Sequence, residues 1–246
     1  FEGVIRTKGE LYDYLREKED STVFIHHDNA YLMDIAHDLN LIPYGSEDSL
    51  YVNGHVTGHS PYLTFEWKAG KDGDLHKVQT QLIGEYNFPN ALAAVTIGRF
   101  FRVEAGKIDE ALAGYTPRNN RSQLKKTADN TLIIDAYNAN PTSMMAALQN
   151  FRNMTVEKKM LILGDMRELG TESAAEHRKI VDFLQECSFE KVLLVGEQFT
   201  ATHPPYHTYA NAQEVIKELQ TEKPKDYTIL IKGSNGIKLN TVVEFL

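Results

Sequence analysis

The sequence predicts an α/β fold: a first domain of mixed character followed by a Rossmann-like domain with a mostly parallel sheet. Three observations support this. After residue 130, short apolar runs alternate with helix-like segments, a rhythm typical of parallel strands covered by helices on both faces. Each of these apolar runs ends in small or polar residues. Before residue 115 the pattern is instead one of alternating runs separated by glycines, which is typical of hairpins.

Composition limits the classes of protein to consider. The chain has 246 residues, enough for one or two domains, with 42% hydrophobic and 24% charged residues. Its net charge of −8 argues against a general nucleic-acid-binding surface. A single cysteine, Cys187, excludes an internal disulfide and fits a reducing compartment, so we expect a cytoplasmic protein. No apolar run approaches the roughly 20 residues of a membrane helix, so no membrane partner is expected.

The elements expected in the first part follow from periodicity. A short apolar run predicts a strand at residues 21–26, and a capped stretch at helical spacing predicts a helix at 31–39. Residues 50–82 predict an antiparallel group of hairpins. Residues 90–101 are apolar on most sides and predict a buried helix, and 107–112 predict a short one.

Residues 115–123 are polar, carry Pro117 and have no period, which predicts a domain junction. We therefore expect domains at 1–115 and 116–246. The strands predicted in the second domain are 131–135, 159–163, 191–195, 207–209 and 227–231. The helices predicted between and after them are 143–151, 172–186, 212–219 and 237–245.

Polar groups follow the predicted strands of the second domain, and the carboxyl ends of parallel strands form the ligand-binding edge of such sheets. These groups lie at Asp135 and Asn138, in the loop 164–170, at 196–197, and at Lys232 and Ser234. Turn formation and helix capping explain such residues equally well in general. We prefer that explanation for 196–197, prefer ligand binding for Lys232 and Ser234, and leave both open for Asp165. The chain contains no phosphate-loop motif and no zinc-ligand spacing.

Five segments, in order, resemble the Mur ligases of peptidoglycan synthesis. They are Glu-Gly-Val-Ile-Arg-Thr-Lys-Gly-Glu at 2–10, Gly-Glu-Tyr-Asn-Phe-Pro-Asn-Ala-Leu-Ala-Ala at 84–94, Asp-Ala-Tyr-Asn-Ala-Asn-Pro at 135–141, Gly-Asp-Met-Arg-Glu-Leu-Gly at 164–170 with His177 downstream, and Lys-Gly-Ser at 232–234. Within that family the chain is most similar to the ligase that adds D-alanyl-D-alanine to UDP-N-acetylmuramoyl-tripeptide. The resemblance spans nearly the whole chain.

This resemblance implies an amide-forming ligase of cell-wall biogenesis, and hence of cell shape and division, which uses ATP and Mg and forms an acyl phosphate. It implies that residues 1–115 are the rear part of a central ATPase domain and 116–246 the carboxyl-terminal domain. The phosphate loop and the UDP-binding domain are then expected upstream of Phe1, and the chain alone is expected to be inactive.

The resemblance also implies roles for individual residues. Lys8 matches a lysine that is carbamylated and thereby becomes a ligand of Mg, which requires a partly buried amine of low pKa. Its alternative is an ordinary exposed lysine in a charged helix. Asn87 and Asn90 match residues at the adenine, and an amide offers the donor and acceptor that adenine requires. Tyr86 stands where the family often has His.

The remaining matches fall in the second domain. Arg121 matches an arginine that reaches the nucleotide phosphates. The residues implied to lie near the ribose and phosphates are Asp135, Tyr137 and Asn138. The candidate ligands of the peptide or dipeptide substrate are Asp165, Lys232 and Ser234. The sequence departs from the family at Ile134, where relatives carry a second acid, and at Asn235, where they often carry Arg.

Two other hypotheses remain open from the sequence. One is a ligase similar to folylpolyglutamate synthase, which shares fold and chemistry but lacks the motifs at 135–141 and 164–170. The other is a non-catalytic nucleotide- or peptide-binding module with a Rossmann-like fold. A phosphate loop in the sequence ahead of Phe1 would favour a ligase, and its absence the binding module.

Overall fold

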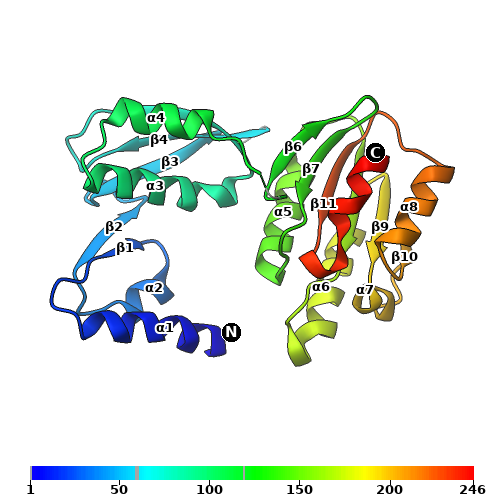
Figure 1. The fold of residues 1–246 in the computed structure, drawn as a ribbon, viewed down its shortest axis with the longest axis horizontal. Coiled ribbons are helices and arrows are strands. Elements are labelled where there is room, and N and C mark those ends of the chain that lie inside the picture. Colours follow the sequence, from blue (N-terminus) through cyan, green and yellow to red (C-terminus); the bar gives the residue numbers. More distant parts are fainter. Residues whose placement is uncertain (1, 59–60, 119) are drawn as a thin grey trace. The chain divides into compact units, whose positions relative to one another are not determined.

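The structure is a computed structural model that describes residues 2–58, 61–118 and 120–246. The chain divides into two compact units, Phe1–Gln81 with Glu85–Tyr115, and Leu82–Gly84 with Thr116–Leu246. The division thus lies at the predicted junction between residues 115 and 116, but residues 82–84 belong to the second unit, which was not predicted. Figure 1 shows the elements of each unit.

The first unit contains a five-stranded sheet in the order β1-β2-β3-β4-β5, with β1, β2 and β3 parallel and β3 antiparallel to β4. The elements of this unit in chain order are α1 (Glu2–Arg16), β1 (Val23–His26), α2 (Ala30–Ile35), β2 (Leu41–Gly45), β3 (Val52–Gly58), β4 (Tyr62–Lys68), β5 (His76–Ile83), η1 (Glu85–Asn87), α3 (Phe88–Phe100) and α4 (Ala105–Gly114). The hairpin prediction is confirmed for β3 and β4. Strand β2 was missed because Pro43 interrupts it and most of its residues are half-buried, which hides any alternation.

A hydrogen-bonded group ties two strands of this sheet to α4. The Trp67 indole N–H donates to Asp109 at 2.8 Å, and His76 Nδ1 lies 2.7 Å from the other carboxylate oxygen. The indole and imidazole rings stack with centroids 4.4 Å apart. Because these polar tips have partners, Trp67 is buried without leaving a donor unsatisfied.

Helix α3 packs on β1, β2 and β3 and buries Leu92 and Val95. The prediction that this helix is buried on most sides is wrong for its outer face. There Ile97 and Phe100 are 41% and 37% exposed. A helix that is apolar on all sides need not be packed on all sides. Among the described residues, the outer face of α3 is left partly exposed.

The second unit contains a six-stranded sheet in the order β10-β9-β8-β11-β7-β6, parallel except for β6, which is antiparallel to β7. The elements of this unit in chain order are β6 (Gln123–Lys126), β7 (Thr131–Asp135), α5 (Pro141–Asn153), β8 (Lys159–Gly164), η2 (Gly170–Glu172), α6 (Ser173–Gln185), β9 (Lys191–Val195), α7 (Glu197–Ala201), β10 (His207–Tyr209), α8 (Ala212–Thr221), β11 (Thr228–Lys232), η3 (Asn235–Ile237) and η4 (Leu239–Phe245). The predicted α/β class with a mostly parallel sheet is confirmed.

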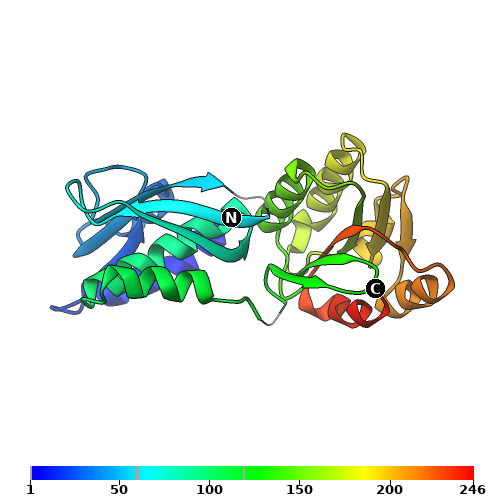
Figure 2. The same ribbon diagram turned by 90° about the horizontal axis from the view of Figure 1, so that it is seen from above.

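The second unit has three layers. Side chains at alternate positions of β7, such as Leu132 and Ile134, pack with Val215 of α8 and Val242 of η4 in one core cluster. Figure 2 shows α5 and α6 on the opposite face of the sheet from α8 and η4. The strands are therefore covered on both faces, as their continuous apolar runs require.

Three features of this unit differ from the predicted elements. The helix expected at 237–245 is instead two 3₁₀ segments, η3 and η4, because Lys238 between them takes a left-handed conformation with φ 59°. Strand β6 overlaps the predicted junction and was missed because it is a short polar edge strand. Helix α7 has only five residues, too few to show a helical period.

Candidate functional site

An ion pair joins the carboxyl ends of two neighbouring strands of the second sheet. Lys232 of β11 and Asp135 of β7 are partners in the parallel register, so their side chains leave the same face of the sheet. Lys232 Nζ lies 2.6 Å from Asp135 Oδ2, and Lys232 is only 1% exposed. The backbone N–H of Ser122 donates to the other oxygen of Asp135. The pair thus satisfies its own charges inside the unit.

A cation–π contact lies in the same region. The guanidinium carbon of Arg121 is 3.9 Å from the centroid of the Tyr137 ring, which is 46% exposed. The backbone carbonyl of Asn138 is 3.4 Å from Lys232 Nζ. The structure therefore brings together the four residues predicted for the nucleotide in this unit, Arg121, Asp135, Tyr137 and Asn138, beside Lys232.

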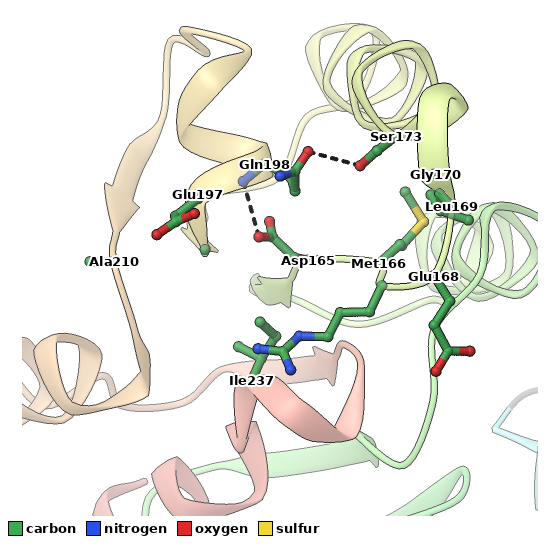
Figure 3. Close-up of a pocket in the computed structure, with 12 residues that line it drawn as sticks. Asp165, Met166, Glu168, Leu169, Gly170, Ser173, Glu197, Gln198, Ala210 and Ile237 are labelled. Atoms are coloured by element: carbon green, nitrogen blue, oxygen red, sulfur yellow. Dashed lines mark hydrogen bonds between the residues drawn. The ribbon is translucent and has the colours of Figure 1, made fainter.

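Asp165, at the end of β8, has a structural task that the sequence did not reveal. Its two carboxylate oxygens each accept a backbone N–H, one from Gln198 and one from Phe199, both at 3.0 Å. Figure 3 shows the bond from Gln198. Asp165 thus caps α7, because the residue at the N-cap position of that helix is Gly196, which has no side chain. A Cβ at Gly196 would lie 2.2 Å from Asp165, and its φ of 124° is also reserved for glycine.

The loop after Asp165 is held by two further side chains. His177, fully buried in α6, accepts the Met166 N–H at Nε2 and lies 2.7 Å from the Ser173 carbonyl at Nδ1. This arrangement requires the proton on Nδ1. Ser234 accepts the Arg167 N–H at 2.9 Å. The motif at 164–170 and the Lys-Gly-Ser segment at 232–234 therefore fix each other in place.

The two segments also approach closely through their glycines. A Cβ on Gly233 would lie 2.9 Å from the Cα of Gly164, which leaves no space for a side chain at that position. Glycine at this point lets β8 and the chain after β11 lie against each other. The sequence pattern Lys-Gly-Ser is thus explained by packing as well as by any ligand.

A pocket of about 720 Å³ opens beside this loop (Figure 3). Its lining comes from the loop, from the starts of α6 and α7, from the residue two before α8 and from the end of η3: Asp165, Met166, Arg167, Glu168, Leu169, Gly170, Ser173, Gly196, Glu197, Gln198, Ala210 and Ile237. Arg167, Glu168 and Glu197 are exposed charged residues, whereas Asp165 is buried. Next to Ala210, burial and the nearby Glu218 charge raise the pKa of the Tyr209 hydroxyl.

Sequence analysis did not single out Arg167 or Glu197 as ligand candidates. We attributed Glu197 to a turn, and it does begin α7, but its side chain also lines the pocket. The signal for Arg167 was its position inside the motif at 164–170 as a cation beside a turn. Of the three predicted substrate ligands, Asp165 lines the pocket. Ser234 does not line it but holds the loop through the Arg167 N–H, and Lys232 is paired with Asp135 instead.

The three candidates of the first unit fall in two places, with Asn87 and Asn90 at the start of α3 and Lys8 on α1. Asn87 occupies the N-cap position of α3, and Asn90 Nδ2 donates to Asn87 Oδ1 at 3.4 Å, so the two amides are adjacent. Lys8 is exposed on α1. The partly buried amine that carbamylation requires is therefore not provided by the surroundings of Lys8 within the described part of this unit.

The described residues contain neither a metal-binding cluster nor a membrane-spanning helix. Across residues 2–58, 61–118 and 120–246, no three His, Cys, Asp or Glu side chains are grouped so that they would hold a metal ion. In the same residues, none of the helices has the length and apolar character needed to cross a bilayer.

Comparison with known proteins identifies the family. Residues 120–235 match the family model described as Mur ligase, glutamate ligase domain. The chain is 32% identical over 176 residues to the UDP-N-acetylmuramoyl-tripeptide–D-alanyl-D-alanine ligase of Bacillus subtilis, covering 67% of the chain and 38% of that protein. It is 32% identical over 208 residues to the ligase of the same name from Escherichia coli, covering 82% of the chain and 45% of that protein.

Solved structures show the same fold. A crystal structure of MurF from Acinetobacter baumannii matches 99% of the chain and 55% of its own length with a TM-score of 0.81 at 24% identity. The MurF ligase of Thermotoga maritima, solved in complex with ADP, matches 93% of the chain and 53% of its own length with a TM-score of 0.76 at 18% identity. The chain spans about half the length of these relatives or less, and it belongs to the Mur ligase family.

Proposed function

We propose that the full-length protein is an ATP-dependent ligase that joins D-alanyl-D-alanine to UDP-N-acetylmuramoyl-tripeptide in peptidoglycan synthesis, in the cytoplasm. The observation that carries this proposal is the joint placement of Arg121, Tyr137 and the Asp135–Lys232 pair at the carboxyl edge of the sheet. The names of the curated relatives support the choice of substrates.

The proposed reaction has two steps. The terminal carboxylate of the tripeptide attacks the γ-phosphorus of ATP, and ADP leaves, which yields an acyl phosphate. The amine of D-alanyl-D-alanine then attacks the acyl carbon, inorganic phosphate leaves, and the nitrogen loses a proton as the amide forms. Such phosphoryl transfer needs positioned positive charge more than covalent help from the protein.

We assign nucleotide-binding roles to residues of each unit separately. Asn87 and Asn90 present adjacent amides, which suit the donor and acceptor of an adenine edge. Arg121 is the cation for the phosphates, and its stacking on Tyr137 limits the directions in which its guanidinium can point. The ADP in the Thermotoga relative supports a nucleotide in this role.

Magnesium is proposed from the resemblance alone. The described residues of this chain do not by themselves supply a set of metal-binding side chains, and the Lys8 amine is exposed. We therefore propose Lys8 as a carbamylated ligand of Mg in the full-length protein only, and we assign no step of the reaction to the ion.

Phosphate release tests the proposed function. We expect the full-length protein to release phosphate from ATP only when both UDP-N-acetylmuramoyl-tripeptide and D-alanyl-D-alanine are present, because the acyl phosphate needs both partners to turn over. A continuous phosphate assay with each substrate omitted in turn measures this.

Single D-amino acids and L-glutamate with a folate acceptor serve as controls. Release that ignores the dipeptide would refute the proposal. Turnover with glutamate and folate would favour a ligase of the folylpolyglutamate-synthase type, whose Mycobacterium tuberculosis structure shares the fold at 17% identity with a TM-score of 0.64. No turnover with any pair would favour a binding module.

A further inference from the structure

We infer that the pocket beside the loop at 164–170 receives the incoming dipeptide, and that the Arg167 guanidinium binds its carboxylate. This inference rests on the proposed function, because it assigns a place to one of the proposed substrates. It names a residue that neither the family motif nor the comparisons assign to a ligand.

The charge of the Arg167 guanidinium is not neutralised by an acid among the described residues. Its backbone N–H is used by Ser234, yet no acid among the residues that the structure describes forms an ion pair with its side chain. Lys232, another cation at this edge of the sheet, is by contrast buried and neutralised by Asp135 at 2.6 Å. An exposed guanidinium at a pocket wall can bind a carboxylate through two parallel N–H···O hydrogen bonds.

The absence of a side chain at Gly236 leaves the space that the Arg167 guanidinium occupies. A Cβ on Gly236, in η3, would lie 2.2 Å from Arg167 Nη1 and 2.6 Å from Cζ. The guanidinium therefore lies directly against the backbone at Gly236, where any larger residue would displace it. Since the neighbouring Glu168 has φ 67°, an uncommon value for a residue with a side chain, the backbone after Arg167 turns sharply at the same point.

The pocket lining carries more acidic than basic side chains. Besides Arg167, its lining carries the carboxylates of Asp165, Glu168 and Glu197. Asp165 is occupied by two backbone N–H groups, but no partner of the Glu168 or Glu197 carboxylate is found among the described residues. Figure 3 shows these two acids on opposite sides of Asp165.

A lining with one cation and a surplus of acids repels a polyphosphate and favours a zwitterion, whose amine is attracted to the acids and whose carboxylate is attracted to the arginine. A free dipeptide has this charge pattern. A volume of about 720 Å³ lies within the usual size of small-ligand pockets, which is roughly 300–1,000 Å³.

Steady-state kinetics of the full-length protein test the assignment. For Arg167→Gln we expect the KM for D-alanyl-D-alanine to rise about 10- to 100-fold, the range for loss of a hydrogen bond to a charged group, with kcat little changed. The KM values for ATP and for UDP-N-acetylmuramoyl-tripeptide should stay as in wild type. D-Alanyl-D-alanine amide, which lacks the carboxylate, should be a much poorer substrate than D-alanyl-D-alanine for the wild type. For Arg167→Gln the amide and D-alanyl-D-alanine should have about equal kcat/KM.

Two further variants separate the role of Arg167 from general effects. Gly236→Ala keeps the charge but displaces the guanidinium, so it should raise the same KM and weaken discrimination against the amide. Lys217→Ala removes one exposed cation from α8, lines no part of the pocket, and should change neither quantity. An unchanged dipeptide KM and unchanged discrimination in Arg167→Gln would overturn the inference.

Binding to this chain distinguishes failure of the inference from failure of the proposed function. NMR titration of residues 1–246 with D-alanyl-D-alanine should shift the Arg167 Nε–H signal, and the amide should shift it far less. If wild-type turnover does not depend on the dipeptide, the proposed function fails, while this titration still decides the pocket. No shift at Arg167 in that case would overturn the inference as well.

Discussion

Lys232 shows how one pair of residues serves both stability and the site. Its ammonium is buried at the end of β11 and is compensated by Asp135, its in-register neighbour on β7. Removing a charged group from water is costly, and it is tolerated here because the opposite charge lies 2.6 Å away. The same pairing fixes the ends of two strands at the edge where Arg121 and Tyr137 meet.

At this scale we predict the effect of removing one partner. Asp135→Ala leaves the Lys232 ammonium buried without a counter-charge and should lower the free energy of unfolding of this unit by about 3–5 kcal/mol. Urea unfolding followed by circular dichroism measures the change. The double variant Asp135→Ala with Lys232→Met should be less destabilised than Asp135→Ala alone, because no buried charge remains. Equal unfolding midpoints for wild type and Asp135→Ala would contradict this account.

At the scale of elements, α7 illustrates a helix whose start depends on another part of the chain. Its N-cap residue, Gly196, contributes no side chain, and Asp165 from the end of β8 accepts the N–H groups of Gln198 and Phe199. Helix α8 has an ordinary local cap, in which Asn211 accepts from Gln213 and Glu214. The two helices therefore allow a distant cap and a local cap to be compared in one molecule.

Asp165→Ala should destabilise the start of α7 by about 1–2 kcal/mol, the cost of a lost cap. Hydrogen exchange measured residue by residue should show faster exchange of the Gln198 and Phe199 amides, with α8 unaffected. Asn211→Ala is the matched control, and it should accelerate exchange at the first turn of α8 only. If α7 exchanges at the wild-type rate in Asp165→Ala, the carboxylate is not its cap.

At the scale of the whole molecule, the proposed role of Lys8 depends on more than its own unit. Lys8 is exposed on α1, whereas a carbamylated lysine requires a partly buried amine of low pKa. The curated relatives are more than twice as long as the segments that they share with this chain, so the proposal applies to the full-length protein.

Lys8→Ala in the full-length protein should abolish phosphate release, and added carbonate should not restore it, because the variant has no amine to carbamylate. The thermal stability of residues 1–246 should be unchanged, since the side chain is exposed and makes few contacts. Arg6→Ala removes another exposed cation of α1 and should keep activity. Full activity of Lys8→Ala would remove Lys8 from the site.

Much of the fold was predictable because it depends on local patterns. The strands of the second sheet are short apolar runs whose alternate residues face two covered sides, and all five predicted strands are present. Three of the elements that were missed, β2, β6 and α7, are short, polar or interrupted by proline, so their formation depends on neighbours rather than on their own sequence. The break at Lys238 was missed because an apolar period does not distinguish an α-helix from 3₁₀ turns.

The sequence alone determined the α/β class, the family resemblance and the list of polar residues at the carboxyl edge of the second sheet, because strand periodicity and the position of each motif after a strand are local properties. Only the tertiary structure decided what those residues do for one another. It paired Lys232 with Asp135, assigned Asp165 to α7 and left Arg167 without an acid partner among the residues that the structure describes. These outcomes depend on distances between segments far apart in the chain, set by strand register and close packing, and no single segment encodes them.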